Sequence, residues 1–165
     1  MGIPISQSPR EFLASLFAIQ EYKIRTYIEI GIHRGGLASL LLARRIFQPD
    51  FKYFGIEIDR EILDPHLFDL AALGVEIVIE DFFSEAGRRW LVNRLYRHSE
   101  PAMVLCDGGN KRREMKEVAH YLRLGDFMMA HDYKKEFFDE DIPDGLERLC
   151  PDWLKCCRLV LMRKL

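Results

Sequence analysis

The stretch from Thr26 to Ala43 constrains the fold of this chain more than any other. It begins with a β-rich run that ends at Ile30, turns through three glycines, and continues into a strongly apolar helical run. A strand, a glycine turn and a helix in that order form the first half of a βαβ unit, whose helix N-terminus faces the space above the carboxyl end of the strand. The glycines, which let the backbone turn sharply and let a ligand approach closely, are Gly31, Gly35 and Gly36.

Glu29 is a charged residue near the end of this otherwise apolar strand. A carboxylate among apolar side chains is destabilising unless something hydrogen-bonds to it. We therefore expect Glu29 to contact a ligand or cofactor. The alternative is a salt bridge with Arg25 or Arg34.

Length and charge limit the class of protein. The 165 residues fit one domain that covers residues 1–165. The formal net charge is −2, so no basic field attracts nucleic acid or an anionic membrane surface. No apolar run approaches the ~20 residues of a membrane span. We therefore expect neither nucleic acid nor a membrane as a partner.

The amino terminus and the cysteines indicate the compartment. The first residues lack the basic region and the long apolar run of a signal peptide. Paired zinc-binding spacing is missing from the four cysteines, which are Cys106, Cys150, Cys156 and Cys157. Reduced thiols are typical of cytoplasmic proteins, so we expect a cytoplasmic location.

Apolar patterns predict the remaining elements. A capping-box pattern at Ser8 and Glu11 predicts a first helix that runs to about Tyr22. Further strands are expected at residues 52–58, 75–80, 102–106 and 127–130, and helices at residues 64–74, 85–98 and 111–123. Alternating strands and helices predict an α/β fold with a Rossmann-like, doubly wound, mostly parallel sheet and helices on both faces.

The pattern of residues after the fifth predicted strand differs from the alternating strands and helices before it. Residues 133–144 are acidic and aromatic without clear periodicity, so we expect a long loop that is mobile without substrate and acts as a lid. Residues 146–154 are expected to form a helix and residues 157–162 a last strand.

Polar residues collect directly after the predicted strands, at Glu57, Asp81, Asp107, His131 and Asp132. In an open α/β sheet, ligands bind at this edge. An acidic residue after the second strand, such as Glu57, is typical of ribose binding because a carboxylate accepts hydrogen bonds from both sugar hydroxyls. The simpler alternatives are a surface acid at Glu57, helix caps or turn formers at the three aspartates, and a structural hydrogen bond at His131.

Between Tyr27 and about Tyr133 the sequence resembles the class I S-adenosylmethionine (SAM)-dependent methyltransferases. Three motifs carry the resemblance: Glu29-Ile30-Gly31 with Gly35-Gly36, the run Gly55-Ile56-Glu57-Ile58-Asp59, and Glu80-Asp81-Phe82. The resemblance is greatest to the branch of cephalosporin hydroxylases and macrocin O-methyltransferases, where EIG-x-x-x-GG and a strand-end DG motif recur. It implies a cofactor-binding set of Glu29, Gly31, Gly35, Gly36, Glu57, Ile58, Asp81, Phe82 and Asp107.

In that branch, and in the catechol O-methyltransferase type, carboxylates after strands four and five hold a divalent metal. Asp107 and Asp132 match those positions, so the resemblance implies that they hold Mg²⁺ or another divalent metal. We expect His131 to be a further metal ligand or the base that takes a proton, and His131 and Asp107 to be the catalytic residues. Two departures stand out: Asn110 replaces a histidine of many relatives, and His131-Asp132 replaces an acidic or amide pair. With one strand expected after the fifth, the predicted sheet is also shortened at its C-terminus.

The sequence as a whole predicts a SAM-dependent methyltransferase that methylates an oxygen of a small molecule, with a homodimer as a candidate assembly. One alternative is a catalytically silent SAM- or nucleotide-binding protein, which the short C-terminus and Asn110 keep open. A second is an NAD-dependent oxidoreductase. The turn from Gly31 to Gly36 argues against the second, since it lacks the middle glycine of GxGxxG that admits a pyrophosphate.

Overall fold

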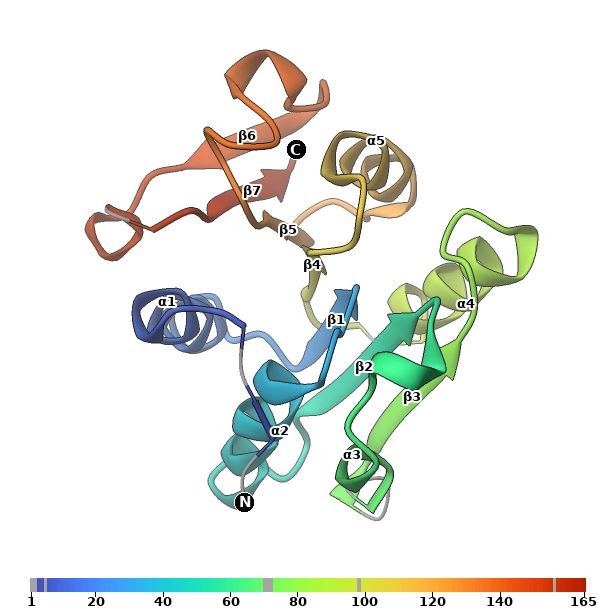
Figure 1. Ribbon diagram of the computed structural model, residues 1–165. Helices are drawn as coiled ribbons and strands as arrows, with labels where there is room; N and C mark the ends of the chain where they lie inside the picture. The colour runs from blue at the N-terminus through green and yellow to red at the C-terminus, as the bar shows by residue number, and fades with distance from the viewer. Residues whose placement is uncertain (1–2, 5, 70–72, 98, 156) are drawn as a thin grey trace.

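The strand that the glycine turn follows lies near the middle of the sheet. A computed structural model describes residues 3–4, 6–69, 73–97, 99–155 and 157–165. In it, β1 (Thr26–Ile30) pairs in parallel with both β2 (Lys52–Glu57) and β4 (Ala102–Cys106). The described strands form one seven-stranded sheet in the order β3-β2-β1-β4-β5-β7-β6 (Figure 1). The order reverses between β1 and β4, and this switch point is where open α/β sheets bind ligands.

The other strands extend the sheet to both edges. They are β3 (Val75–Ile79), β5 (Phe127–Ala130), β6 (Leu146–Leu149) and β7 (Val160–Lys164). β3 continues the parallel pairing beyond β2, and β5 continues it beyond β4. β7 runs antiparallel to both β5 and β6. The prediction of a mostly parallel α/β sheet is confirmed.

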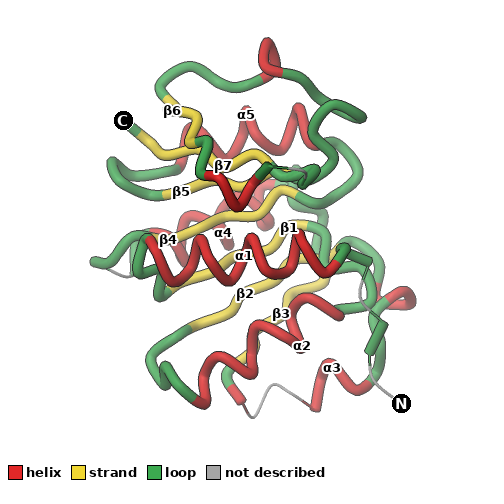
Figure 2. The backbone as a smooth tube through the Cα atoms, turned by 90° about the vertical axis from the view of Figure 1, so that its left-hand side faces the viewer, coloured by secondary structure: helices red, strands yellow, loops and turns green. Residues whose placement is uncertain are grey.

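Helices cover both faces of the sheet (Figures 1 and 2). They are α1 (Pro9–Glu21), α2 (Gly36–Leu42), α3 (His66–Asp69), α4 (Glu85–Leu95) and α5 (Lys111–Tyr121). Alternation along β1 separates the core into two clusters: Tyr27 packs with residues of α1 and α2, while Ile28 packs with residues of α4 and α5. Short 3-10 helices lie at Ala43–Ile46 (η1), Arg60–Ile62 (η2), Asp139–Asp141 (η4) and Asp152–Leu154 (η5).

The predicted start of the first helix is confirmed. Ser8 caps α1, and its side chain accepts a hydrogen bond from the backbone N–H of Glu11 at 3.4 Å. The Glu11 carboxylate in turn accepts one from the backbone N–H of Ser8 at 2.7 Å. This reciprocal pair satisfies two amides that the first turn of a helix leaves without partners.

The C-terminal prediction was wrong in two respects. Residues 146–154 do not form a helix, since β6 occupies Leu146–Leu149 and a 3-10 turn follows at Asp152–Leu154. Pro151 explains the first error, because proline removes a backbone donor and breaks a helix interior. The second error follows from the first: β6 and β7 form an antiparallel pair that adds two strands beyond β5, so the sheet is not shortened.

Other boundaries differ less. The predicted strand at residues 52–58 ends at Glu57, and the described part of the predicted helix at residues 64–74 is the single turn α3. Leu70 and Ala71 of that helix, His98 and Cys156 lie outside the described residues, and the helix predicted at residues 85–98 ends at Leu95. The expected loop at residues 133–144 contains a 3-10 turn and a single β-bridge between Tyr133 and Phe137, and Phe137 is 0% exposed within the core. Its mobility stays a prediction.

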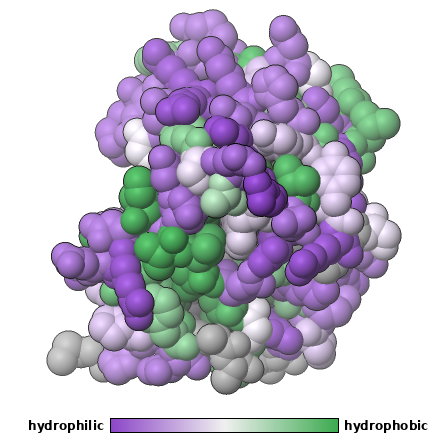
Figure 3. All heavy atoms as spheres, turned by 90° about the vertical axis from the view of Figure 1, so that its right-hand side faces the viewer, coloured by the Kyte–Doolittle hydropathy of each residue, from purple (hydrophilic) through white to green (hydrophobic). Residues whose placement is uncertain are grey.

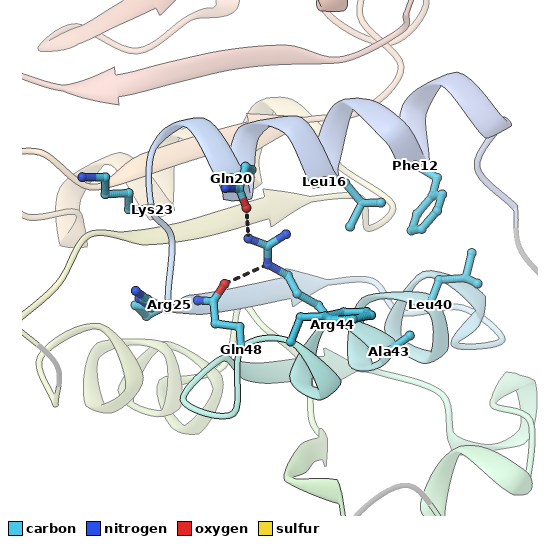
Figure 4. A pocket seen from close by; sticks show the side chains of 10 residues that line it. Phe12, Leu16, Gln20, Lys23, Arg25, Leu40, Ala43, Arg44 and Gln48 are labelled. Atoms are coloured by element: carbon cyan, nitrogen blue, oxygen red, sulfur yellow. Dashed lines mark hydrogen bonds between the residues drawn. The ribbon is translucent and has the colours of Figure 1, made fainter.

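Two surface features lie away from the strand ends. Seen from the right-hand side of Figure 1, the molecule shows a hydrophobic patch among mostly hydrophilic side chains (Figure 3). A groove of about 720 Å³ runs between α1 and α2–η1, where Phe12, Leu16 and Leu40 gather at one end and Arg44 is hydrogen-bonded to Gln20 and Gln48 (Figure 4). Within the described residues, every helix is too short or too polar to cross a membrane.

The loops that follow β1 and β4 approach each other closely. A Cβ atom built on Gly31 would lie 2.5 Å from Gly108 Cα, well inside van der Waals contact. Gly31 also has φ +83°, a left-handed conformation that favours glycine. Position 31 therefore requires glycine for two separate reasons, and the contact places the two loops side by side at the sheet edge.

Gly31→Ala should lower the free energy of unfolding more than Gly125→Ala does. Gly125 has φ +84° and nothing within 4 Å of a built Cβ, so it reports the conformational strain alone, about 1 kcal/mol. At Gly31 the overlap with Gly108 adds about 1–3 kcal/mol. Urea denaturation of the two variants measures the difference, and equal losses would show that the loops do not meet as described.

Candidate functional site

A cavity of about 310 Å³ lies where β1, β2 and β3 end. The strand ends supply Gly31, Glu57, Ile58, Asp81 and Phe82, and the loop after β4 supplies the opposite side. These five residues belong to the predicted cofactor set, so the structure brings together side chains that the sequence spreads over about fifty positions. The cavity stands at the switch point of the sheet.

Glu57 is held in a fixed orientation at the cavity. Its side chain is nearly buried, and Oε2 accepts a hydrogen bond from the backbone N–H of His33 at 2.9 Å. Oε1 accepts from the backbone N–H groups of Ile58 at 2.8 Å and Asp59 at 3.3 Å. Three amides thus orient one carboxylate before any ligand arrives, and charge-assisted bonds of this kind are strong.

The Asp81–Phe82 segment forms the wall of the cavity after β3. Asp81 is exposed, and its Oδ1 accepts a hydrogen bond from the backbone N–H of Phe83 at 2.8 Å. The helix cap of α4 is Ser84, whose hydroxyl accepts from Gly87 N–H at 2.9 Å. The simpler alternative, that Asp81 caps this helix, is therefore wrong.

Glu29 lies inside the protein rather than on the cavity wall. It is 0% exposed, Tyr53 donates a hydrogen bond to its Oε2, and its Oε1 has no hydrogen-bond partner among the described residues. Burial raises the pKa of Glu29 well above its usual range, and the nearby charges of Asp107 and Glu57 raise it further. The alternative of a salt bridge between Glu29 and Arg25 is wrong, because the Arg25 side chain pairs with Asp50 at 3.0 Å.

Gly35 and Gly36 have packing roles in this structure. Gly35 stands at the N-cap of α2 with φ +87°, and a Cβ atom there would lie 2.4 Å from a methyl carbon of Leu67. Gly36 is the buried first residue of the helix. Neither borders the cavity described above, so their contact with a cofactor stays a prediction.

A cluster of charged residues adjoins the loop after β4. Asp107, His131 and Asp132 each offer one ligand atom, and these atoms all lie within 4.8 Å of one another. His131 Nδ1 is 3.1 Å from Asp107 Oδ1 and 3.4 Å from Asp132 Oδ2. Asp132 has φ +64°, a strained conformation of the kind that concentrates at functional sites. The predicted metal ligands therefore do converge.

Glu11 of α1 faces the other side of the imidazole, with Oε1 3.2 Å from His131 Nε2. The contact is an ion pair when the ring is protonated. Burial lowers the pKa of His131, but the hydrogen bond and charge of Asp107, with the charges of Glu11 and Asp132, raise that pKa above its usual value. The carboxylates around the ring thus favour imidazolium.

Lys111 supplies a second cation to the same cluster. Its Nζ lies 3.2 Å from Glu136, 3.7 Å from Asp132 and 3.8 Å from Asp107. Burial lowers the pKa of Lys111, yet Asp107, Glu136 and Glu114 together raise it above its usual value, so the side chain stays charged. Gln7 completes the surroundings of Asp107 by donating a hydrogen bond to its Oδ2 at 2.7 Å.

The loop after β4 is fixed by residues of α5. Asn110 caps this helix by accepting a hydrogen bond from Arg113 N–H at 3.1 Å. The buried carboxylate of Glu114 accepts from Gly108 N–H at 3.1 Å and Asn110 N–H at 3.0 Å. Because Asn110 holds the cap position, the alternative that Asp107 caps this helix is wrong.

Sequence reasoning missed Lys111 and Glu114 and assigned Glu11 only to a cap. A signal was present, since the buried stripe of α5 contains Lys111 and Glu114 beside Met115 and Val118. Glu11 likewise lies on the buried stripe of α1. A charged residue on the apolar stripe of a helix needs a partner inside the protein, which points to a polar site.

Comparisons with known proteins identify the fold. A scan against models of protein families finds no match, and neither does a search of curated proteins. Among solved structures, CmcI with SAH superposes at a TM-score of 0.68 and 20% identity, over 96% of this chain and 78% of that one. A mutant of MtNAS in complex with S-adenosylmethionine superposes at 0.62 and 19% identity, over 94% and 62% of the chains.

The O-methyltransferase TomG from Streptomyces achromogenes, in complex with SAM, superposes at a TM-score of 0.54 and 22% identity, over 79% of this chain and 57% of that one. The chain spans about half the length, 54%, of the apo CmcI chain. At these identities the likeness shows the fold: this chain has the Rossmann-like α/β fold of these proteins.

The stability that His131 contributes should depend on pH. A histidine whose pKa is raised on folding stabilises the native state fully below the pKa of the unfolded chain, 6.5, and this contribution is lost as pH rises through the folded-state pKa. The difference in unfolding free energy between the wild type and His131→Asn should therefore shrink as pH rises above 6.5.

Urea denaturation in the presence of a chelator measures this difference, with His120→Asn on the exposed side of α5 as the control for loss of a histidine. A difference that stays constant or grows with pH would contradict the described cluster.

Proposed function

We propose that this chain is a SAM-dependent methyltransferase that transfers a methyl group to an oxygen of a small molecule. The cavity at the switch point carries the proposal, since it holds Glu57 in a fixed orientation beside the Asp81–Phe82 wall. Solved proteins of similar fold were obtained with SAH or SAM, and TomG is an O-methyltransferase.

In the proposed complex, Glu57 accepts hydrogen bonds from the ribose hydroxyls, while Ile58, Asp81 and Phe82 contact the adenine side. Gly31, whose missing side chain lets Gly108 approach, borders the cavity and would contact the methionine portion. Glu29 is buried against Tyr53 and Asp107 lies outside the cavity lining, so the contacts of these two residues with the cofactor stay predictions. Gly35 and Gly36 act by shaping the turn below it.

The geometry of the turn disfavours the NAD-dependent alternative. His33 stands where GxGxxG has its middle glycine, and its backbone N–H is already donated to Glu57 at 2.9 Å. A pyrophosphate would need that amide, whereas SAM has no phosphate.

The alternative of a catalytically silent protein was kept open by a short C-terminus and by Asn110. The first of these two reasons no longer holds, because the β6–β7 pair is present. Turnover with an acceptor separates it from the proposed enzyme.

The proposed reaction is an SN2 displacement in which the bond from the methyl carbon to sulfur breaks as the bond to oxygen forms. The chain aligns the two partners and excludes water. Where no metal occupies the cluster, His131 takes the hydroxyl proton when its ring is unprotonated, with Asp107 3.1 Å from Nδ1 to orient it. Since the pKa of His131 is raised, this role requires a higher pH than an ordinary histidine would.

The donor set fits a divalent metal. Two carboxylates and an imidazole within 4.8 Å suit Mg²⁺ through oxygen, and His131 favours Mn²⁺ or another transition metal. Such an ion, when bound, lowers the pKa of an oxygen bound to it. A CmcI structure of similar fold was solved with Mg and SAM. We propose Asp107, Asp132 and His131 as the residues that would hold the ion.

The acceptor is proposed to be a small molecule. The single domain over residues 1–165, the homodimer and the cytoplasmic location also stay predictions.

Glu57→Gln should weaken SAM binding at least tenfold. A charge-assisted hydrogen bond contributes about 1.5–3 kcal/mol, and the amide side chain loses the charge while it keeps the size. Glu61→Gln, an exposed residue of η2 outside the cavity, is the matched control and should bind SAM as the wild type does. Isothermal titration calorimetry measures both. Unchanged affinity in Glu57→Gln, or NAD binding in place of SAM binding, would contradict the proposed function.

A further inference from the structure

The first residue of α5 places a buried ammonium group among the candidate metal ligands. Lys111 has a side chain that is only 7% exposed, and its Nζ lies within 4 Å of three carboxylates. A buried lysine is stable only where charges of opposite sign surround it. The structure therefore holds a cation of its own at the point where the carboxylates converge.

The atoms that face Lys111 are the atoms a metal would need. Nζ is 3.8 Å from Asp107 Oδ1 and 3.7 Å from Asp132 Oδ2. These same two oxygens lie 3.1 and 3.4 Å from His131 Nδ1, so they define the centre of the three-residue cluster. A divalent ion would bind such oxygens at about 2.0–2.6 Å, which leaves it close to an ammonium of like charge. Repulsion between the two cations in a poorly solvated site is strong.

We propose that Lys111 is a built-in counter-cation that competes with a divalent metal for Asp107 and Asp132. The proposal deepens the proposed methyltransferase site and rests on it for the identity of the metal ligands. When the metal is absent, the ammonium balances the two aspartates and keeps them converged. A metal binds only after Lys111 gives up these contacts, so the lysine sets how tightly the site takes a metal.

Glu136 is an ion-pair partner that the Lys111 ammonium keeps when a metal displaces it from the aspartates. Its Oε2 is 3.2 Å from Nζ, closer than either aspartate, and it comes from the loop after β5 rather than from the metal cluster. Lys111 therefore retains one ion pair when the two aspartates turn to a metal. The exchange needs a rotation of the lysine side chain and no movement of a strand.

Two other cations near Asp132 differ from Lys111 in their exposure. Lys135 Nζ is 3.4 Å from Asp132 Oδ1 but 59% exposed, and Arg158 is 3.8 Å away and 64% exposed. Water and salt screen exposed charges, so these two contribute little to competition with a metal. Lys135 is a matched control, since it bears the same charge at a shorter distance from the same aspartate.

The test measures Mn²⁺ binding without SAM, by calorimetry and by the electron paramagnetic resonance signal of free Mn²⁺. Lys111→Met should bind one Mn²⁺ at least tenfold more tightly than the wild type does. Lys135→Met should stay within about threefold of the wild type, as its charge is screened. Asp107→Asn added to Lys111→Met should remove the gain, which locates the ion at the cluster.

Equal or weaker Mn²⁺ binding by Lys111→Met, or no binding by either protein, would overturn the proposal. A gain that survives Asp107→Asn would do the same. If Lys111→Met does not fold, as judged by circular dichroism, Lys111→Gln replaces it with the same expected gain. SAM binding is measured separately, so failure of the proposed function would show as no SAM affinity while the Mn²⁺ result still decides the role of Lys111.

Discussion

The contact between the loops after β1 and β4 is the constraint on which the rest of the site depends. Gly31 and Gly108 approach so closely that a Cβ atom on the first would lie 2.5 Å from the second. This approach occurs at the switch point of the sheet, where the two halves diverge. The cavity bordered by Glu57 and Phe82 includes Gly31 and Gly108, and Asp107 of the cluster around His131 directly precedes Gly108.

The two sides stabilise their carboxylates by different means. Glu57 and Glu114 accept hydrogen bonds from backbone amides of the loops beside them. Asp107 and Asp132 instead face His131 and Lys111. Amides are fixed in place and suit a ligand that is always bound in one orientation. Side-chain cations are able to move, which suits the proposed exchange of protons, an acceptor or a metal at this cluster.

The sequence predicted the elements that local patterns determine and missed what only distant contacts determine. The strands at residues 102–106 and 127–130 were predicted to the residue, because each is a short apolar run bounded by turn residues. Residues 146–154 were misread because their apolar spacing also suits a helix, and only pairing with β7 makes Leu146–Leu149 a strand.

The candidate site was predicted in part. The structure brings Glu57, Asp81 and Phe82 to one cavity as predicted, whereas Glu29 is buried against Tyr53. The buried stripe of α5 marks Lys111 as a buried charge, but its contacts with Asp132 and Glu136 in the loop after β5 are distant in sequence and no local pattern shows them.

A crystal structure with S-adenosylhomocysteine tests the central claim most directly. The account predicts the ribose hydroxyls on Glu57, the adenine beside Asp81 and Phe82, and the sulfur directed toward Asp107 and His131. Binding of the ligand elsewhere, for example in the groove between α1 and α2, or no binding at concentrations that saturate enzymes of similar fold, would contradict it.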